Sequence, residues 1–342
     1  MKNKMEDSGL SFLKDIVKEI GGEYTQLASD IDETETYVDT GSYIFNALVS
    51  GSIFGGVSGN KITAIAGETS TGKTFFSLAV VKNFLDNNPT GYCLYFDTEA
   101  AITKSLLESR GVDTSRLVVV NVVTVEEFRT KTLKAVDIYL KKKEDERNPC
   151  IFVLDSLGML STNKEINDAL AEKDTRDMTK AQLIKGAFRM LTLKLGQAKI
   201  PMLVTNHTYE SMSLYGGKQM SGGSGLQYAA STIIYLSKSK EKDGTEVIGN
   251  IIRAKTHKSR LSKENQDVEI RLYYDDRGLD RYYGLLELGE LGGLWKNVAG
   301  RYEIDGKKLY AKEILKNTEK YFTPEVMEKL DVIAKGEFSY GV

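Results

Sequence analysis

The sequence contains few of the residues that build redox or metal centres, with only two cysteines and two histidines among 342 residues. Cys93 and Cys150 each border an apolar run that we expect to form a buried strand, and we interpret both as reduced core residues. No apolar run approaches the roughly 18 residues that a membrane-spanning helix needs, and residues 1–10 lack the apolar segment of a secretion signal. We therefore expect a cytoplasmic protein with no membrane partner.

A strong net charge is also absent, since the formal charge is −2 at pH 7. This value argues against a surface coated in basic residues for nucleic acid, but it leaves room for a local basic track. Residues 238–263 form such a segment, with eight lysines and arginines against three acidic residues. The segment is either a phosphate-binding track or the charged edge of a solvated hairpin, and composition does not choose between them.

Apolar runs alternate with amphipathic helical segments from about residue 40 onward. The continuous runs "KITAIA", "CIFVLDSL" and "PMLVTNH" are typical of strands buried on both faces. The predicted fold class is therefore α/β, with a mostly parallel, twisted β-sheet flanked by helices. After "STIIYL" the pattern changes to that of β-hairpins, and from about residue 283 it becomes helical and charged.

These changes of pattern divide the chain into an N-terminal helix and linker at 1–38, a core at 39–282 and a small C-terminal α/β module at 283–342. Apolar residues at helical spacing predict a short helix over residues 10–20, followed by a polar, acidic connector. A short amphipathic helix is marginally stable alone. We expect it to bury its apolar stripe on a neighbouring subunit, with packing on its own domain as the alternative.

The stretch "GETSTGKT" matches the phosphate-binding pattern G-x-x-x-x-G-K-S/T, with an apolar strand before it and a helix after it. Its glycines allow backbone N–H groups to face phosphate oxygens, while Lys73 reaches the β- and γ-phosphates and Thr74 binds Mg²⁺. The predicted nucleotide-binding residues here are Gly67, Glu68, Thr69, Ser70, Thr71, Gly72, Lys73 and Thr74. The pattern predicts that a phosphate is held, but not how its energy is used.

Acidic residues end two of the expected strands, where they can supply the chemistry of nucleotide hydrolysis. Asp155 ends the run "IFVLD" and is predicted to hold the Mg²⁺ shell through water. Asp97 and Glu99 end a second strand, and the carboxyl ends of strands line the ligand crevice of an open parallel sheet. Either residue is a candidate for the base that activates water, and their spacing does not decide between them.

His207 follows the run "PMLVTN", and we predict that it contacts the γ-phosphate from the edge of the crevice. Residues 208–225 then form a loop rich in glycine, serine and methionine, which we expect to order on binding a partner. Its apolar residues are expected to have no core to join, so they could insert between nucleic-acid bases. If the loop binds nucleic acid, the candidate contacts are Met212, Leu214, Tyr215, Lys218, Met220, Gly222 and Gly223.

Six motifs occur in an order that resembles the RecA family: "GETSTGKT", "YFDTEAAI", "RGVDTSRLVVV", "IFVLDSLGML", "LVTNHTYE" and "MSGGSG". The segments "DALAEKDTRDMTKAQLIKGAFR" and "THKSR" are similar to the phage-type UvsX recombinases in particular. The resemblance covers about residues 38–295. It implies a RecA-type P-loop ATPase core that uses ATP and Mg²⁺.

The same resemblance implies a DNA-dependent ATPase that forms helical filaments on single-stranded DNA and exchanges strands with double-stranded DNA. Such a protein acts in recombination, repair and recombination-dependent replication. The implied partners are DNA, further copies of the chain in a filament or a hexameric ring, a recombination mediator and a single-strand-binding protein. The implied location is the host cytoplasm if a phage encodes the chain.

The resemblance also assigns roles to residues that the patterns left open. Glu99 takes the position of the water-activating carboxylate, and His207 takes that of the γ-phosphate sensor. Lys258 and Arg260 match a basic pair that reaches the ATP of the next subunit. Their spacing on a strand-like segment would point both side chains to one side.

One departure from the family concerns the adenine site. Leu106 stands where relatives carry an aromatic residue that stacks on the base, and it is expected to cover adenine by aliphatic packing. Tyr273 or Tyr274 of a neighbouring subunit is expected to supply the other face. Two DNA-binding loops are implied, at about 161–175 and at 208–225.

Two other functions are compatible with the same motifs. A ring-forming DNA helicase would share the phosphate loop and Asp155, but it would usually carry a further primase-related domain, for which we expect no room. A nucleotide-gated scaffold without enzymatic activity would bind protein partners instead of DNA. Weak or absent stimulation of ATP turnover by DNA would favour the scaffold.

Overall fold

The computed structural model describes residues 2–21, 25, 27–30, 36–173, 178–210, 218–275, 277–304 and 306–341. The chain forms two units, Met1–Thr36 and Tyr37–Val342. The first unit contains helix α1 (Lys2–Ile20) and a 3₁₀ turn at Ala28–Asp30. The expected helix is confirmed and begins earlier than residue 10, because no proline interrupts the polar residues before it. Phe12 and Ile20 of α1 are largely exposed.

A nine-stranded sheet forms the centre of the second unit, with eight strands in the order β11-β10-β9-β3-β7-β6-β4-β5 and β8 paired to β7. Its strands are β3 (Ile62–Gly67), β4 (Tyr92–Asp97), β5 (Leu117–Asn121), β6 (Cys150–Asp155), β7 (Met202–Glu210), β8 (Lys218–Met220), β9 (Thr232–Asp243), β10 (Glu246–Ser259) and β11 (Asp267–Tyr273). The six strands from β9 to β5 are parallel, whereas β9, β10 and β11 are joined antiparallel. The predicted parallel core followed by hairpins is confirmed.

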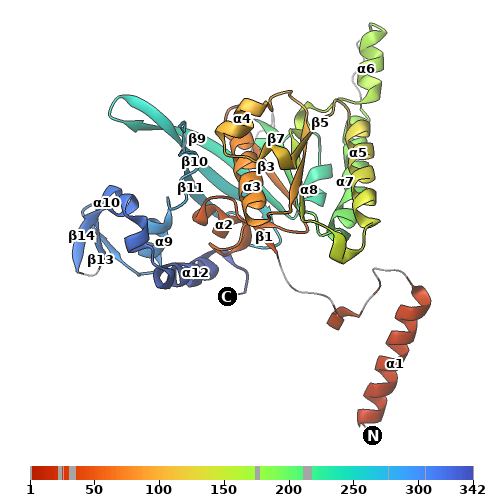
Figure 1. Ribbon diagram of the computed structural model, residues 1–342, viewed down its shortest axis with the longest axis horizontal. Helices are drawn as coiled ribbons and strands as arrows, with labels where there is room; N and C mark the ends of the chain where they lie inside the picture. Colours follow the sequence, from red (N-terminus) through yellow and green to blue (C-terminus); the bar gives the residue numbers. More distant parts are fainter. Residues whose placement is uncertain are drawn as a thin grey trace. The chain divides into compact units, whose positions relative to one another are not determined.

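Helices cover both faces of this sheet, as Figure 1 shows. One face is covered by α2 (Tyr43–Ser50), α3 (Lys73–Asn87) and α4 (Lys104–Ser109), and the other by α5 (Val125–Leu140), α7 (Lys180–Gln197) and α8 (Gly225–Ala229). Each face has its own apolar cluster, so every residue of β3 and of β6 is buried. Burial on both faces explains why these strands are continuous apolar runs.

The remaining elements lie outside the central sheet. They are β1 (Tyr37–Val38), β2 (Val57–Ser58), α6 (Asn163–Leu170), α9 (Leu285–Leu291), β12 (Lys296–Val298), β13 (Arg301–Ile304), β14 (Lys307–Tyr310), α10 (Ala311–Lys316), α11 (Thr318–Tyr321) and α12 (Pro324–Phe338). β12, β13 and β14 form a separate antiparallel sheet. Within the described part of the chain, no helix is both long and apolar enough to cross a membrane.

The C-terminal segment shares its core with the central domain. Trp295, Phe322 and Leu330 belong to the same apolar cluster as Leu48 of α2. A buried carboxylate joins the two parts, because Asp331 of α12 accepts hydrogen bonds from the Ser52 hydroxyl at 2.6 Å and from the Ile53 N–H at 2.9 Å. The packing therefore continues across residue 283, the boundary that we proposed from the sequence.

We predict that Asp331→Ala lowers the free energy of unfolding by about 2 kcal/mol, because a buried N–H group and a partly buried hydroxyl lose a charged acceptor. Glu325→Ala on the same helix is the matched control, since Glu325 is exposed and pairs with the exposed Lys329. The control should change stability by less than ~0.5 kcal/mol. Urea unfolding of both variants measures the difference, and equal midpoints would contradict the role of Asp331 in joining the two parts.

Candidate nucleotide site and nucleic-acid loop

The phosphate loop connects β3 to α3, as the motif requires. α3 begins at Lys73, directly after Gly72, whose φ of 92° lies in the left-handed region. A Cβ atom on Gly67 would lie 2.9 Å from the carbonyl oxygen of Leu236 on β9. Both glycines are therefore required, one by backbone conformation and the other by the close approach of the neighbouring strand.

A cavity of about 370 Å³ lies above this loop and gathers residues from the carboxyl ends of four parallel strands. It is lined by Thr69, Ser70, Gly72, Lys73, Thr74, Phe75, Glu99, Asp155, His207, Lys238, Asn250, Leu272 and Tyr274. The structure thus brings together the predicted Lys73, Thr74, Glu99, Asp155 and His207. Their convergence agrees with the rule that open parallel sheets bind ligands at this edge.

Lys73 points back toward the loop that precedes it. Its Nζ atom donates to the carbonyl oxygens of Gly67 at 3.0 Å and Glu68 at 2.8 Å. Burial lowers the pKa of Lys73, while the negative charges of Asp155 and Glu99 oppose that shift. A lysine held this way has its charge at the cavity wall and can exchange carbonyl partners for phosphate oxygens.

Asp155 is the buried carboxylate of the site, with 6% of the residue exposed. Its Oδ2 atom accepts from Thr74 Oγ1 at 2.8 Å and from Tyr95 Oη at 2.7 Å, and its Oδ1 atom accepts from the hydroxyl of Thr205. In the described residues, no cluster of three or more histidine, cysteine or acidic side chains could hold a metal ion. A hydroxyl beside one carboxylate nevertheless suits Mg²⁺, which takes its other ligands from phosphates and water.

Asp97 and Glu99 have different environments, which separates their roles. Asp97 is buried and accepts hydrogen bonds from the backbone N–H groups of Glu99 at 3.0 Å and Ile102 at 3.0 Å. It therefore shapes the turn after β4 and does not line the cavity. Glu99 lines the cavity and accepts from Ser156 Oγ at 2.7 Å. This geometry favours Glu99 as the base.

Glu99 and His207 contact each other across the cavity. His207 Nε2 lies 3.2 Å from Glu99 Oε1. Burial alone would raise the pKa of Glu99, but hydrogen bonds from Ser156 and His207 outweigh burial and lower it. The Glu99 carboxylate is therefore ionised at neutral pH and can accept a proton from water.

The described parts of the segment after His207 include strand on both sides, whereas its composition suggested a loop. β7 continues to Glu210 and pairs with β8, which begins at Lys218. The expectation that the loop's apolar residues have no core to join is wrong for Met220, which is 3% exposed and belongs to the apolar cluster of β7 and α7. β8 turns its alternate side chains inward, so Met220 is buried.

Gly222 and Gly223 lie in a turn packed on α7. Both have positive φ values, and a Cβ atom on either would lie 3.0 Å from a side-chain atom of Ile184 or Ala181. Their conformation and packing account for the glycines without a DNA contact. Met212, Leu214 and Tyr215 lie outside the described residues.

The segment expected to be the first DNA loop is largely helical. Residues Asn163–Leu170 form α6, which begins with reciprocal hydrogen bonds between Thr162 and Glu165. Figure 1 shows α6 extending beyond the body of the domain. Leu170 at its end is largely exposed.

Lys258 and Arg260 are placed differently from the expectation that both point to one side. β10 ends at Ser259, and a bulge interrupts its pairing with β9 between Thr256 and Lys258, so strand alternation does not extend to Arg260. Lys258 Nζ donates to the carbonyl oxygens of Gln227 at 2.6 Å and Ala230 at 2.8 Å, at the C-terminal end of α8. Arg260 is exposed.

Leu106 does not line the phosphate cavity, since it packs partly buried against the apolar cluster beneath α4. Tyr274 does line it, and its hydroxyl donates to Asn250 Oδ1 at 3.2 Å. Tyr274 thus faces the cavity of its own chain, and its contact with the adenine of a neighbouring subunit stays a prediction. Tyr273 instead packs under the guanidinium group of Arg277, 3.7 Å from the ring centre.

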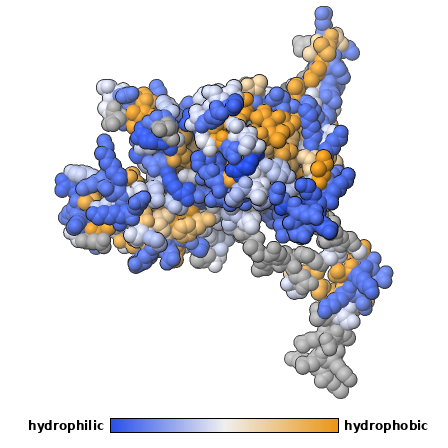
Figure 2. Space-filling model, viewed as in Figure 1, coloured by the Kyte–Doolittle hydropathy of each residue, from blue (hydrophilic) through white to orange (hydrophobic). Residues whose placement is uncertain are grey.

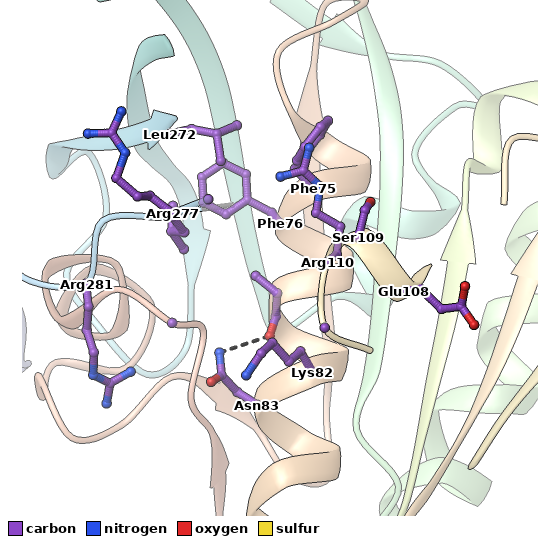
Figure 3. Close-up of a pocket in the computed structure, with 15 residues that line it drawn as sticks. Phe75, Phe76, Lys82, Asn83, Glu108, Ser109, Arg110, Leu272, Arg277 and Arg281 are labelled. Atoms are coloured by element: carbon purple, nitrogen blue, oxygen red, sulfur yellow. Dashed lines mark hydrogen bonds between the residues drawn. The ribbon is translucent and has the colours of Figure 1, made fainter. Parts of the chain in front are cut away.

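A second cavity of about 480 Å³ shares Phe75 and Leu272 with the phosphate cavity. Figure 3 shows Arg110 beside Phe75 at its upper end, with Arg277 and Arg281 on the opposite wall. The Arg110 guanidinium lies 4.0 Å from the centre of the Phe75 ring. The aromatic residue at this end of the site is therefore Phe75 of α3, whereas α4 carries Leu106 at the position where relatives have an aromatic residue.

Sequence reasoning missed Tyr95, Ser156, Thr205 and Lys238. Lys238 of β9 donates to the carbonyl oxygen of Ser70 at 2.7 Å and so holds the outer side of the phosphate loop. Tyr95 and Thr205 could have been noticed as polar residues inside apolar runs, close to the end of a strand. Ser156 follows the predicted Asp155 directly.

The site and the sheet together define an α/β P-loop core of the RecA type, and comparisons with known proteins agree. The model of the RecA N-terminal domain matches residues 10–280. A "Recombination and repair protein" of Enterobacteria phage T4 is 33% identical over 300 residues, which are 87% of this chain and 74% of that protein. "Protein RecA" of Paenarthrobacter aurescens is 25% identical over 336 residues, covering 96% and 92% of the two chains.

The chain therefore belongs to the RecA family. The resemblance to its phage-type UvsX branch is confirmed by the similarity to the phage T4 protein. A further relative, "Protein RecA" of Streptomyces coelicolor, is 24% identical over 335 residues, covering 96% of this chain and 85% of that one. The similarity thus extends beyond the phosphate loop to most of the chain.

We predict that Lys258→Met loosens α8, because three backbone carbonyls at its end lose a charged donor. Hydrogen exchange at the N–H groups of Tyr228 and Ala230 should become about 10-fold faster, equivalent to about 1.4 kcal/mol. Arg260→Met is the matched control and should leave these rates unchanged. Equal exchange in both variants would show that Lys258 does not hold the helix.

Proposed function

We propose that this protein is an ATP- and Mg²⁺-dependent DNA recombinase. It forms filaments on single-stranded DNA and catalyses homologous pairing and strand exchange in recombination, repair and recombination-dependent replication. One observation carries the proposal: a single strand, β7, bears His207 in the phosphate cavity and leads directly into the hairpin that holds the candidate DNA loop. The names of the relatives from phage T4 and from bacteria support the same function.

The cavity contains groups for each part of ATP hydrolysis. Lys73 and the loop N–H groups bind the phosphates, and Thr74 and Asp155 would hold Mg²⁺, which neutralises charge on the phosphate oxygens when bound. Glu99 accepts a proton from the attacking water. His207 contacts the γ-phosphate. Because His207 is part of β7, this contact can shift the strand when the γ-phosphate is present.

Contacts at the base of the hairpin support coupling between nucleotide and DNA. Lys218 Nζ lies 2.7 Å from Glu68 Oε1, so the first residue of β8 is joined to the phosphate loop. A change at the γ-phosphate can therefore bias the segment between β7 and β8. Met212, Leu214 and Tyr215 of that segment are proposed to insert between bases. Backbone groups near Lys218, Gly222 and Gly223 are proposed to contact the DNA as well.

Self-assembly is supported by exposed apolar surface. β5 is an edge strand of the sheet, and Val118, Val119 and Val123 in and beside it are exposed. Figure 2 shows an apolar patch in this region. We propose that residues 1–38 serve oligomerisation, with α1 docking on a neighbouring subunit. Deletion of residues 1–22 should then abolish filaments in electron micrographs.

The basic pair Lys258 and Arg260 is proposed to complete the ATP site of the next subunit. In that state Lys258 would leave the carbonyls of α8 that it binds here. The test mixes a Lys73→Ala chain with a Lys258→Ala/Arg260→Ala chain, each inactive alone. ATPase activity should return in part if the pair acts between subunits, and its absence from co-assembled filaments would contradict that role.

Strand exchange between circular single-stranded DNA and homologous linear duplex DNA tests the proposed function. The wild-type protein should form joint molecules in ATP and Mg²⁺. Lys73→Ala should lose this activity, because the lysine that binds the phosphates is missing. ATP-driven unwinding of a forked duplex without pairing activity would instead indicate a helicase, and nucleotide binding without any effect on DNA would indicate a scaffold.

We predict that Glu99→Gln retains ATP binding and nucleotide-dependent DNA binding but hydrolyses ATP at least ~100-fold more slowly, because an amide cannot accept a proton. Phosphate release and binding of a fluorescent ATP analogue measure the two properties separately. The matched control is Glu144→Gln, which should hydrolyse ATP normally, because Glu144 is exposed and lines neither of the two cavities. Near-normal hydrolysis by Glu99→Gln would remove Glu99 from the role of base.

A further inference from the structure

Two hydroxyl groups inside the sheet bind the Asp155 carboxylate without reaching the phosphate cavity. Tyr95 Oη donates to Asp155 Oδ2 at 2.7 Å, and the Thr205 hydroxyl donates to Oδ1. Both residues are fully buried, with 0% exposed, and neither lines the cavity. They therefore act on the carboxylate from behind, on the side away from the nucleotide.

The strand register explains how both hydroxyls reach the same carboxylate. Tyr95 of β4 is in register with Val153 of β6, two residues before Asp155, so the three side chains share one face of the sheet. Thr205 of β7 follows Val204, which is in register with Leu154, and this places it beside Asp155 on the other side. The central strand β6 thus receives one donor from each neighbouring strand.

Shape alone does not require a hydroxyl at either position. Tyr95 belongs to the same apolar cluster as Cys93, Ile151 and Leu203, in which a phenylalanine would pack as well. A buried hydroxyl without a partner costs free energy, so its value here lies in its hydrogen bond. A carboxylate can accept about four hydrogen bonds. Tyr95 and Thr205 each occupy one acceptor site, on Oδ2 and on Oδ1. The remaining acceptor sites of the carboxylate therefore point toward Thr74 and the cavity.

We propose that Tyr95 and Thr205 are positioning residues that hold Asp155 in the orientation needed to bind the Mg²⁺ shell of the nucleotide. The proposal rests on the Mg²⁺–ATP site proposed above. The two strands beside β6 then donate the outer hydrogen bonds that orient a metal-binding carboxylate. Thr74, which donates to the same Oδ2 atom from the cavity side, is then already aligned with it.

The test uses Tyr95→Phe and Thr205→Val, which remove the hydroxyls and conserve volume. Each has a matched control. Tyr92→Phe removes a hydroxyl from the other end of β4, near the Cys150 thiol, and Thr63→Val removes a buried hydroxyl on β3 that has no hydrogen-bond partner in the described part of the chain. Affinity for a fluorescent ATP analogue is measured in EDTA and across a titration of free Mg²⁺, and Mn²⁺ binding with the nucleotide is followed by electron paramagnetic resonance.

Tyr95→Phe and Thr205→Val should each need about 10-fold more Mg²⁺ or Mn²⁺ for half-saturation, the typical effect of losing an outer hydrogen bond at a metal site. Their affinity for the analogue in EDTA should stay within about twofold of wild type, and both controls should behave as wild type. Thr205→Ser keeps the hydroxyl and should restore normal Mg²⁺ dependence, even where Thr205→Val folds poorly.

Three results would overturn the proposal. The first is a Mg²⁺ titration of both variants within about twofold of wild type. The second is an equal loss of affinity with and without Mg²⁺, which would indicate a general disturbance of the fold. The third is a Thr205→Ser variant that behaves like Thr205→Val. If wild-type protein itself binds the analogue without any Mg²⁺ dependence, the proposed ATP site fails and this inference fails with it.

Discussion

A carboxylate buried at the end of a central strand is the constraint on which the rest of the site depends. A carboxylate buried inside the sheet costs free energy unless neighbouring groups donate hydrogen bonds to it. The donors are Thr74 of α3, Tyr95 of β4 and Thr205 of β7. The carboxylate therefore requires the strand order β7–β6–β4 and the position of the phosphate-loop helix at the same time.

The same strand order connects the nucleotide to the surface proposed to bind DNA. Along β7, Thr205 touches Asp155, His207 reaches Glu99, and Tyr209 already pairs with β8 in the hairpin. The ion pair of Lys218 with Glu68 connects β8 to the phosphate loop. A strand of nine residues thus leads from the carboxylate proposed to bind Mg²⁺ to the base of the candidate DNA loop. Coupling between ATP and DNA needs no long-range movement in such an arrangement.

The sequence was sufficient to predict the sheet, the phosphate loop and the positions of Asp155 and His207, because each depends on a local pattern of apolar strands ending in polar residues. It did not separate Asp97 from Glu99 without the family resemblance, because their roles depend on a turn in which Asp97 binds the backbone N–H groups of Glu99 and Ile102. A single sequence gives the spacing of the two carboxylates but not the direction of the chain between them.

Other features depended on tertiary contacts that no local pattern encodes. Met220 is buried because the chain returns to pair with β7, whereas its glycine-rich surroundings suggested an exposed loop. Lys258 binds α8 because a bulge shifts the end of β10. Tyr274 faces the cavity of its own chain because β11 ends beside β10, which carries its partner Asn250.

The central claim is that the γ-phosphate bound at this edge of the sheet controls the affinity for DNA. Fluorescence anisotropy with a labelled single-stranded oligonucleotide tests it directly, comparing wild-type protein in Mg²⁺ with a non-hydrolysable ATP analogue and with ADP. The structure predicts that binding is at least ~10-fold tighter with the ATP analogue, a difference of about 1.4 kcal/mol. Equal affinity with the two nucleotides would contradict the claim.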